Sequence, residues 1–263
     1  MVHLADGILE DTSLLAGVSC LGAAAVVVAM TRVRRCTRGA AWTGALAAFV
    51  LAAQAVNVPV VPGASAHVVG AGLMTIAVGP ARAIVGMFAV LIVQALLFAD
   101  GGVTALFVNT LNLAVIPVLV THLLRVALKG VSRGRVLAAG LGTLLGNVLG
   151  AASLATLLVV GAGAPALVSF GWLVGVQAAA GAVEGVLASL SVAYLLRRAP
   201  ALMASKSSDA PRALDERAAP PPTPLAGLGG LLLLLGAAVL LLPFASEVPD
   251  ALEVLLESWE RPQ

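Results

Sequence analysis

Apolar residues occur in long stretches along the chain, and polar and charged residues gather in the short segments between them. A helix that crosses a lipid bilayer needs about 20 consecutive, mostly apolar residues. The pattern therefore predicts an all-α polytopic membrane protein with a seven-helix bundle, a polar linker and one further C-terminal spanning helix. The expected spans cover residues 13–31, 40–58, 67–81, 83–99, 102–124, 136–160, 168–196 and 225–243.

The composition agrees with this class. Of the 263 residues, 60% are hydrophobic and 11% are charged, and the mean hydropathy is +1.05. Soluble domains are about half apolar and about a quarter charged. Cys20 and Cys36 have no CxxC spacing, so neither a disulfide framework nor a thiolate metal site is expected. No basic segment precedes the first apolar run, so we expect no secretory signal peptide.

Lys and Arg residues follow the first, third, fifth and seventh expected spans, and most acidic residues occupy the opposite set of loops. Cytoplasmic loops of membrane proteins are enriched in Lys and Arg. All 15 basic residues except Arg261 are cytoplasmic if the N-terminus lies outside. We therefore expect a multi-pass protein in the lipid of the cell membrane, with an extracellular N-terminus. The acidic residues expected outside are Asp6, Glu10, Asp11, Asp100, Glu247, Asp250, Glu253, Glu257 and Glu260.

Residues 199–224 are rich in proline, serine and charged residues, which is typical of a flexible to semi-extended linker. This expected cytoplasmic linker divides the chain into two parts. Residues 1–198 form the seven-span unit, and residues 225–263 form a single-span appendage with an extracellular tail.

His3 is one of three histidines and lies beside the N-terminus. A histidine there offers a divalent metal ion the terminal amine, a deprotonated backbone amide and an imidazole. This nearly planar donor set suits Ni(II) or Cu(II), and it suits Zn(II), Mg(II) and Ca(II) poorly. The amine belongs to Met1, or to Val2 if Met1 is removed; if Met1 stays, Val2 adds a further amide nitrogen.

A second imidazole, His67, follows a break between two expected spans. Residues 57–72 contain two prolines and a glycine, so the helix cannot continue through them. Irregular backbone at membrane depth is tolerated only inside protein or along a cavity, and transporters place substrate sites at such breaks. A plain extracellular hairpin is the alternative, but the histidine favours a functional site. We predict that the rest of the fold brings His67 to the N-terminus.

Polar side chains inside the other spans have two interpretations each. Asn109 and Asn112 either hold His67 or a loop in place, or hydrogen-bond between helices. Glu184, the only carboxylate within a span, is either a functional group or a structural hydrogen-bond partner, and Gln177 shares nearly the same face. Asp6 and Ser65 complete the side chains that we expect to support the metal ligands.

Together these residues resemble the CbiM/NikM family, whose members are the substrate-binding S components of energy-coupling factor transporters for nickel and cobalt. The resemblance covers about residues 3–198, and the tail from Pro249 to Glu253 looks like the PDGLE motif of the small NikN-type subunit. The similar stretches are His3–Leu9, Pro62–His67 with Gly70 and Leu73, Gln94, Asp100–Leu106 leading to Asn109 and Asn112, and Glu184-Gly185.

The resemblance implies that the chain captures Ni(II) or Co(II) as cargo, with the terminal amine, the amide and imidazole of His3 and the imidazole of His67 as ligands. It implies no catalytic cofactor and no nucleic acid. Its partners would be a transmembrane coupling subunit and two cytoplasmic ATPases, since the chain has no nucleotide-binding loop. It would thus be a transport subunit and not an enzyme.

Three residues depart from the family pattern. Family members usually begin Met-His, whereas Val2 intervenes here, and removal of Met1 would restore the amine-to-histidine spacing. Gln177 stands where the family often has histidine, and Ala251 replaces the glycine of the tail motif. Planar amide ligation and the tail favour nickel, and the rest of the pattern fits either metal.

Two other classes of function remain open on the sequence. A membrane-integral enzyme would use Ser65, His67 or Glu184, although no GxSxG motif is present. A secondary transporter or channel acting alone would use Glu184 as a proton site. Both alternatives leave the histidine beside the N-terminus without a role.

Overall fold

The structure is a computed structural model that describes residues 3–33, 37–55, 58–61, 64–203, 252 and 254–256. The expected eighth span, 225–243, and nearly all of the expected linker lie outside the described residues, as do Met1 and Val2. The same holds for the side chains of both strands, including that of Ser65.

Helices form most of the described chain, as expected for long apolar segments that must satisfy their own backbone hydrogen bonds in lipid. They are α1 (Thr12–Arg32), α2 (Thr37–Gln54), α3 (Ala71–Val78), α4 (Pro80–Val93), α5 (Leu106–Thr110), α6 (Ile116–Ala127), α7 (Gly134–Gly161), α8 (Ala166–Arg198) and α9 (Pro200–Met203). Two π-helical turns, η1 (Gln94–Phe98) and η2 (Leu111–Val115), continue α4 and join α5 to α6. Among the described residues, five helical segments are long and apolar enough to cross a membrane, and α2 contains a shorter apolar helix.

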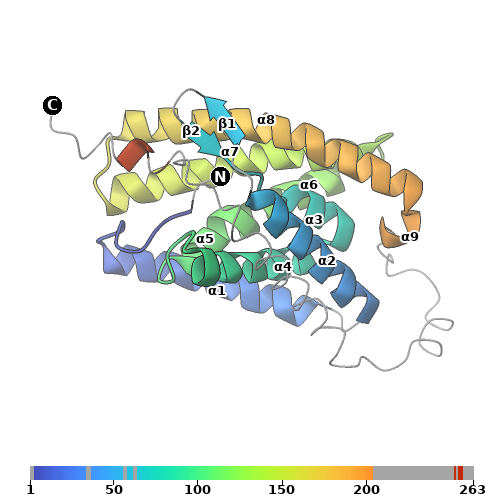
Figure 1. Ribbon diagram of the computed structural model, residues 1–263, viewed down its shortest axis with the longest axis horizontal. Coiled ribbons are helices and arrows are strands. Elements are labelled where there is room, and N and C mark those ends of the chain that lie inside the picture. Colours follow the sequence, from blue (N-terminus) through green and yellow to red (C-terminus); the bar gives the residue numbers. More distant parts are fainter. Residues whose placement is uncertain are drawn as a thin grey trace.

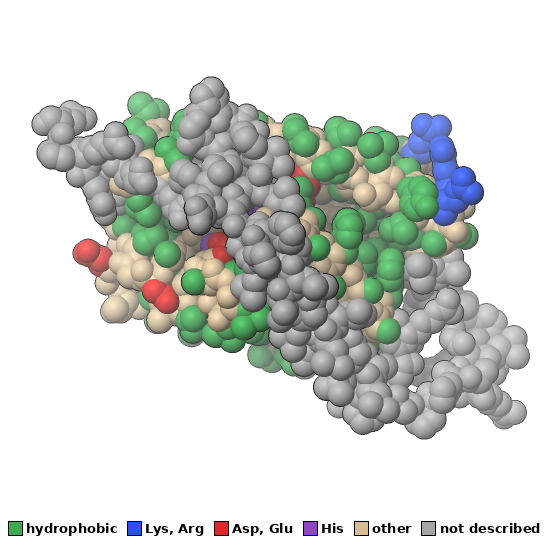
Figure 2. All heavy atoms as spheres, in the orientation of Figure 1, with side chains coloured by type: hydrophobic (Ala, Val, Ile, Leu, Met, Phe, Trp, Pro, Cys, Tyr) green, Lys and Arg blue, Asp and Glu red, His purple; other side chains and the backbone are tan. Residues whose placement is uncertain are grey.

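The helices form a bundle with the two longest members, α7 and α8, side by side along one edge (Figure 1). On the opposite edge α1 packs against α4, while α3 lies between and contacts α4, α6 and α7. Small residues allow the close approaches, because a side chain on Gly142 or Gly146 of α7 would collide with Thr121 or Pro117 of α6. Basic residues end α8, and Figure 2 shows Lys and Arg side chains gathered at that end, with the acidic ones elsewhere on this face.

The region around His67 differs from a simple third span. Two short strands, β1 (Val58–Val61) and β2 (Ala64–Ala66), pair antiparallel, with Val58 opposite Ala66. Proline disrupts a helix, so the chain between the second and third expected spans is not helical, and it forms a β-hairpin there. The helix that follows, α3, has 8 residues instead of the 15 or so expected, and at 1.5 Å per residue it rises only about 12 Å. An extended segment, His67–Gly70, leads into it.

Buried apolar residues form two clusters. The larger one fills the space between α2, α3, α4, α6 and α7. The smaller one, which we call the N-terminal cluster, lies where the N-terminal segment meets α5, α7 and α8, and it includes two leucines near the C-terminus. Its buried members are Leu4, Leu9, Ala105, Val108, Leu154, Ala155, Leu157, Leu158, Ala164, Leu173, Val176, Leu252 and Leu255.

Candidate metal centre

The N-terminal segment folds back into the bundle and is held there by its backbone. The Leu4 N–H donates to Oδ1 of Asn109 over 2.8 Å, and Nδ2 of Asn109 donates to the Leu4 carbonyl over 2.9 Å. The same carbonyl accepts the Gly102 N–H over 2.8 Å, and Leu4 is fully buried. Asn109 therefore holds a loop in place, which is one of its two expected roles, and its target is the segment that carries His3.

Asp6 fastens the other end of this segment. Its carboxylate accepts the Thr104 N–H over 2.8 Å, the Val103 N–H over 3.0 Å and the Thr104 hydroxyl. These donors favour the charged form, the Thr104 hydroxyl most strongly, and they hold the pKa of Asp6 below its usual value against the opposing effect of burial. Asp6 thus supports His3 by fixing the backbone around it.

Glycines at 101 and 102 permit this close docking. A side chain on Gly102 would drive its Cβ into Oδ1 of Asp6 and place it 2.5 Å from the Asp6 nitrogen. Gly101 has a φ of 91°, and a Cβ there would lie 3.1 Å from the Cβ of His3. The Gly-Gly pair is therefore needed both for the backbone conformation and for the space that the N-terminal segment fills.

We predict that Gly102→Ala weakens Ni(II) binding by roughly 10- to 100-fold, because the new methyl group displaces the segment that carries His3. Metal affinity measured by chelator competition checks this. Gly171→Ala is the matched control, since nothing lies within 4 Å of its added Cβ. Equal affinities of the two variants would contradict the predicted dependence on docking.

His3 and Asp100 form the first contact of the candidate centre. His3 Nδ1 lies 2.6 Å from Oδ1 of Asp100, and the side chains are 2% and 42% exposed. A carboxylate only accepts, so Nδ1 donates and the other ring nitrogen, Nε2, is left as a lone pair in the neutral imidazole. Burial raises the pKa of Asp100, but the hydrogen bond from His3, and the positive charge that His3 carries when its ring is protonated, outweigh burial, and the pKa lies below its usual range.

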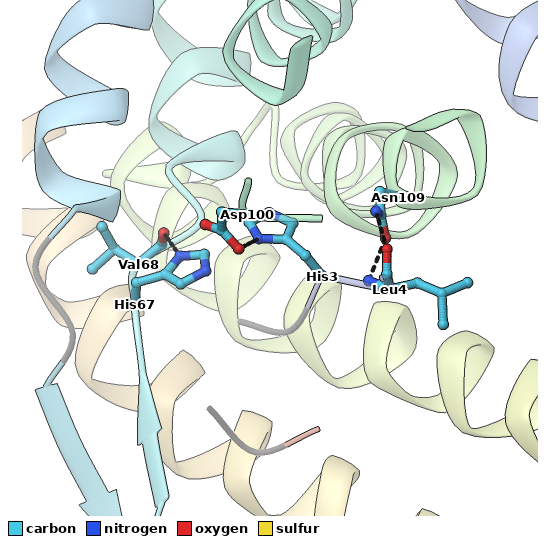
Figure 3. A network of polar contacts seen from close by, with 6 residues as sticks. All are labelled: His3, Leu4, His67, Val68, Asp100 and Asn109. Carbon is cyan, nitrogen blue, oxygen red and sulfur yellow. Dashed lines mark hydrogen bonds and ion pairs between the residues drawn. The ribbon is translucent and has the colours of Figure 1, made fainter. Parts of the chain in front are cut away.

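His67 lies against His3. Its ring centroid is 5.2 Å from that of His3, the ring planes meet at 25°, and both residues are buried. His67 Nδ1 lies 3.0 Å from the Val68 carbonyl, which can only accept, so this contact places the proton on Nδ1 and the lone pair on Nε2. Figure 3 shows Asp100 and the two rings close together, with Asn109 holding Leu4 on the far side of His3.

The ligand atoms of His3, His67 and Asp100 lie within 4.8 Å of one another, close enough for one metal ion. Two of the three are the histidines predicted from the sequence. Asp100 was expected only as one of several outward acidic residues, and its place beside His3 was missed. The available signal was its position in the Asp-Gly-Gly stretch that leads to Asn109, where two glycines allow another segment to approach.

A second group of polar contacts fixes the segment after His67. Glu184 on α8 accepts the Gly70 N–H over 2.7 Å through Oε1 and the Asn147 Nδ2 over 2.9 Å through Oε2. Gln54 on α2 donates to the Val69 carbonyl over 2.8 Å. Gly70 has a φ of 79°, and a Cβ there would collide with Val50. Glu184 is therefore a hydrogen-bond partner that positions the His67–Gly70 segment.

Asn112 and Gln177 are buried, but within the described part of the chain their amide atoms have no hydrogen-bond partner. They do not make the contact to His67 that was considered for Asn112. Asn112 lies in η2 and Asn109 in α5, so a π-helical turn separates two residues that a regular helix would place on one face. π-turns are frequent at functional sites.

Comparison with known protein families shows to which family this chain belongs. The family described as CbiM, cobalt uptake substrate-specific transmembrane region, matches residues 3–202. The chain belongs to the CbiM family. This confirms the resemblance drawn from the His3, His67 and Asp100–Asn112 stretches.

Relatives of this CbiM-family chain are named as metal transport proteins. A fused nickel transport protein of Rhodobacter capsulatus is 33% identical over 185 residues, which are 63% of this chain and 53% of that protein. A putative metal transport protein of Haloquadratum walsbyi is 39% identical over 124 residues, or 46% of this chain and 56% of that one. The chain thus spans about half the length of these curated relatives.

Solved structures show the same fold. The crystal structure of a truncated transition metal transporter matches with a TM-score of 0.68 and 27% identity, over 74% of this chain and 99% of that one. A second transition metal transporter structure matches with a TM-score of 0.64 over the same share of this chain.

Proposed function

We propose that this CbiM-family chain is the membrane subunit that captures Ni(II) or Co(II) outside the cell for an ATP-driven importer. The observation that carries the proposal is the buried meeting of His3 and His67 beside Asp100, built from three distant parts of the chain. Relatives named as nickel and cobalt transport proteins support the choice of cargo.

The proposed ligands are the terminal amine, a deprotonated backbone amide and the imidazole of His3, and the imidazole of His67. An imidazole that binds the same metal ion as its own backbone amide must use Nδ1, because this closes a six-membered ring and Nε2 cannot reach. His67 offers Nε2, since Nδ1 faces the Val68 carbonyl. The amine of Met1, or of Val2, lies outside the described residues.

This ligand set gives Asp100 a role. In the metal-free protein Asp100 holds the proton on His3 Nδ1, the nitrogen that must bind the metal. Metal binding through Nδ1 requires this ring proton to move to Nε2, and deprotonation of the amide releases a proton to solvent, so affinity falls as pH is lowered. Asp100 then offers a negative charge within ligand distance of the same ion. It first orients His3 and afterwards neutralises part of the charge of the cargo.

We predict that Asp100→Asn weakens Ni(II) affinity by roughly 10- to 100-fold, because it removes a negative charge beside the proposed ion and the carboxylate that orients His3 before metal binds. Asp11→Asn is the matched control, because it removes one acidic charge while asparagine still caps α1 as aspartate does. Chelator competition at fixed ionic strength measures both. An Asp100→Asn affinity equal to that of Asp11→Asn would remove Asp100 from the mechanism.

The proposed orientation places the N-terminus outside. Basic residues stand in the last turns of α1, α6 and α8, and the positive-inside rule would make that side cytoplasmic. Asp6 and Asp100 then lie on the outer side, where negative charge raises the local concentration of cations. Cargo would reach His3 and His67 past the half-exposed side chain of Asp100.

The energy for uptake would come from partners, a transmembrane coupling subunit and two cytoplasmic ATPases, because the sequence has no nucleotide-binding loop. Reconstitution in liposomes tests this. We expect Ni(II) or Co(II) uptake only with the partner subunits and ATP, and metal binding without transport by the chain alone. Uptake by the chain alone under a proton gradient would support a secondary transporter instead. Both oxygens of Glu184 are engaged in positioning contacts, which argues against that alternative.

A further inference from the structure

The leucines near the C-terminus are buried in the same cluster as the segment that carries His3. Leu252 and Leu255 are 2% and 4% exposed, and both belong to the N-terminal cluster with Leu4 and Leu9. Leu256 packs against the same cluster. The fold therefore brings Leu252 and Leu255 into one apolar cluster with Leu4 and Leu9, although some 240 residues separate the two pairs.

The local geometry suits a docked helical turn. The backbone is helical at 252 and 254–256, and residues three apart lie on one helical face, so Leu252 and Leu255 point the same way. In Figure 1 this turn, drawn in red, lies at the opposite end of the long axis from α9. It is thus near the start of α8, at the end of the bundle where α7 finishes.

The N-terminal segment is consequently held from two sides. Asn109, Gly102 and Thr104 bind its backbone and Asp6 by hydrogen bonds. Leu4 and Leu9 enter the N-terminal cluster, which the two C-terminal leucines help to close. Removal of apolar surface from water is the dominant favourable term in such docking, so withdrawal of the C-terminal leucines would take away part of the apolar packing of the cluster that holds Leu4 and Leu9.

We propose that the turn at 252–256 is a clasp that keeps the N-terminal segment seated and thereby slows the release of bound metal. This inference rests on the proposed metal capture by His3 and His67. The clasp gives the described residues near the C-terminus, 252 and 254–256, a definite role in the retention of cargo. Displacement of the clasp unseats the residue next to His3.

The test uses the full chain carrying Leu252→Ser and Leu255→Ser together. Ni(II) is loaded, excess chelator is added, and release is followed with time. We expect release at least about tenfold faster than in the unaltered chain, because burial of a single leucine side chain already corresponds to about that factor. Leu167→Ser is the matched control, since this leucine of α8 is 89% exposed. Hydrogen exchange of the metal-free proteins should be faster at residues 3–9 in the double variant only.

The outcomes separate the two proposals. Equal release rates and equal exchange at residues 3–9 in the double variant and the control would overturn the clasp while leaving metal capture intact. Failure of the unaltered chain to bind Ni(II) or Co(II) would overturn metal capture, and exchange at 3–9 would still report on the seating of the segment. Leu9→Ala combined with Leu252→Ala adds a check against misfolding, because a shared cluster predicts non-additive effects on exchange.

Discussion

Replacement of His67 by alanine is expected to weaken Ni(II) or Co(II) binding by at least about 100-fold, more than the loss of a residue that merely orients a ligand. His67 is the proposed ligand from outside the N-terminal peptide, and its ring lies 5.2 Å from that of His3. Without His67, only the proposed ligands of the N-terminal peptide remain, and the helical bundle contributes no imidazole to the metal ion. Chelator competition gives the affinity.

His122→Ala is the matched control for this prediction. It removes a histidine from α6, which lies outside the group formed by His3, His67 and Asp100. Thermal unfolding of the metal-free variants shows whether either substitution disturbs the fold. Affinity retained in His67→Ala, or lost equally in His122→Ala, would contradict the assignment of His67.

Addition of one residue before the natural N-terminus is expected to abolish high-affinity binding, again by about 100-fold or more. The extension turns the amine into an amide and moves the new amine away from His3. It also adds volume where the N-terminal segment is packed, since His3 and Leu4 are buried. Intact mass shows which amine the natural chain presents, that of Met1 or that of Val2.

A cleavable extension provides the control for this second prediction. Removal of the extra residue by a protease should restore the affinity in the same sample, which separates a blocked amine from a misfolded protein. Undiminished binding by the extended protein would exclude the terminal amine as a ligand. The metal would then be held by side chains alone, with His3, His67 and Asp100 as the available group.

The bundle was largely predictable because lipid leaves a long apolar segment little choice but a helix. The ends of α1, α7 and α8, and those of α4 taken together with η1, lie within a few residues of the expected spans. The proximity of His3 and His67 was predictable from their chemistry. Each imidazole offers a nitrogen that can bind a metal ion, and neither histidine has another evident role in an apolar chain.

The conformations of the connecting segments were not predictable in the same way. Hydropathy does not distinguish a hairpin followed by a short helix from a third span, and the left-handed backbone at Gly70 depends on packing against Val50. The contact of Asp100 with His3 depends on the π-turn η1 and on Ala99, which has a φ of 53°. Such turns depend on tertiary packing and leave no periodic pattern in the sequence.

Glu184 shows why a lone intramembrane acid has two interpretations. Its hydrogen bonds to Gly70 and Asn147 join α8 and α7 to the start of α3. Residue type alone could not identify those partners. The backbone N–H of Gly70 is available to Glu184 because the chain is not helical before α3. The acid affects the metal centre through the segment that carries His67.

The most direct test of the proposed metal centre is X-ray absorption spectroscopy of the Ni(II)-loaded full chain, with intact mass measured on the same sample. We predict a four-coordinate, planar site of nitrogen donors with scattering from two imidazoles, and one imidazole fewer in His67→Ala. A six-coordinate site dominated by oxygen, unchanged in His67→Ala, would contradict capture by the N-terminal amine, His3 and His67.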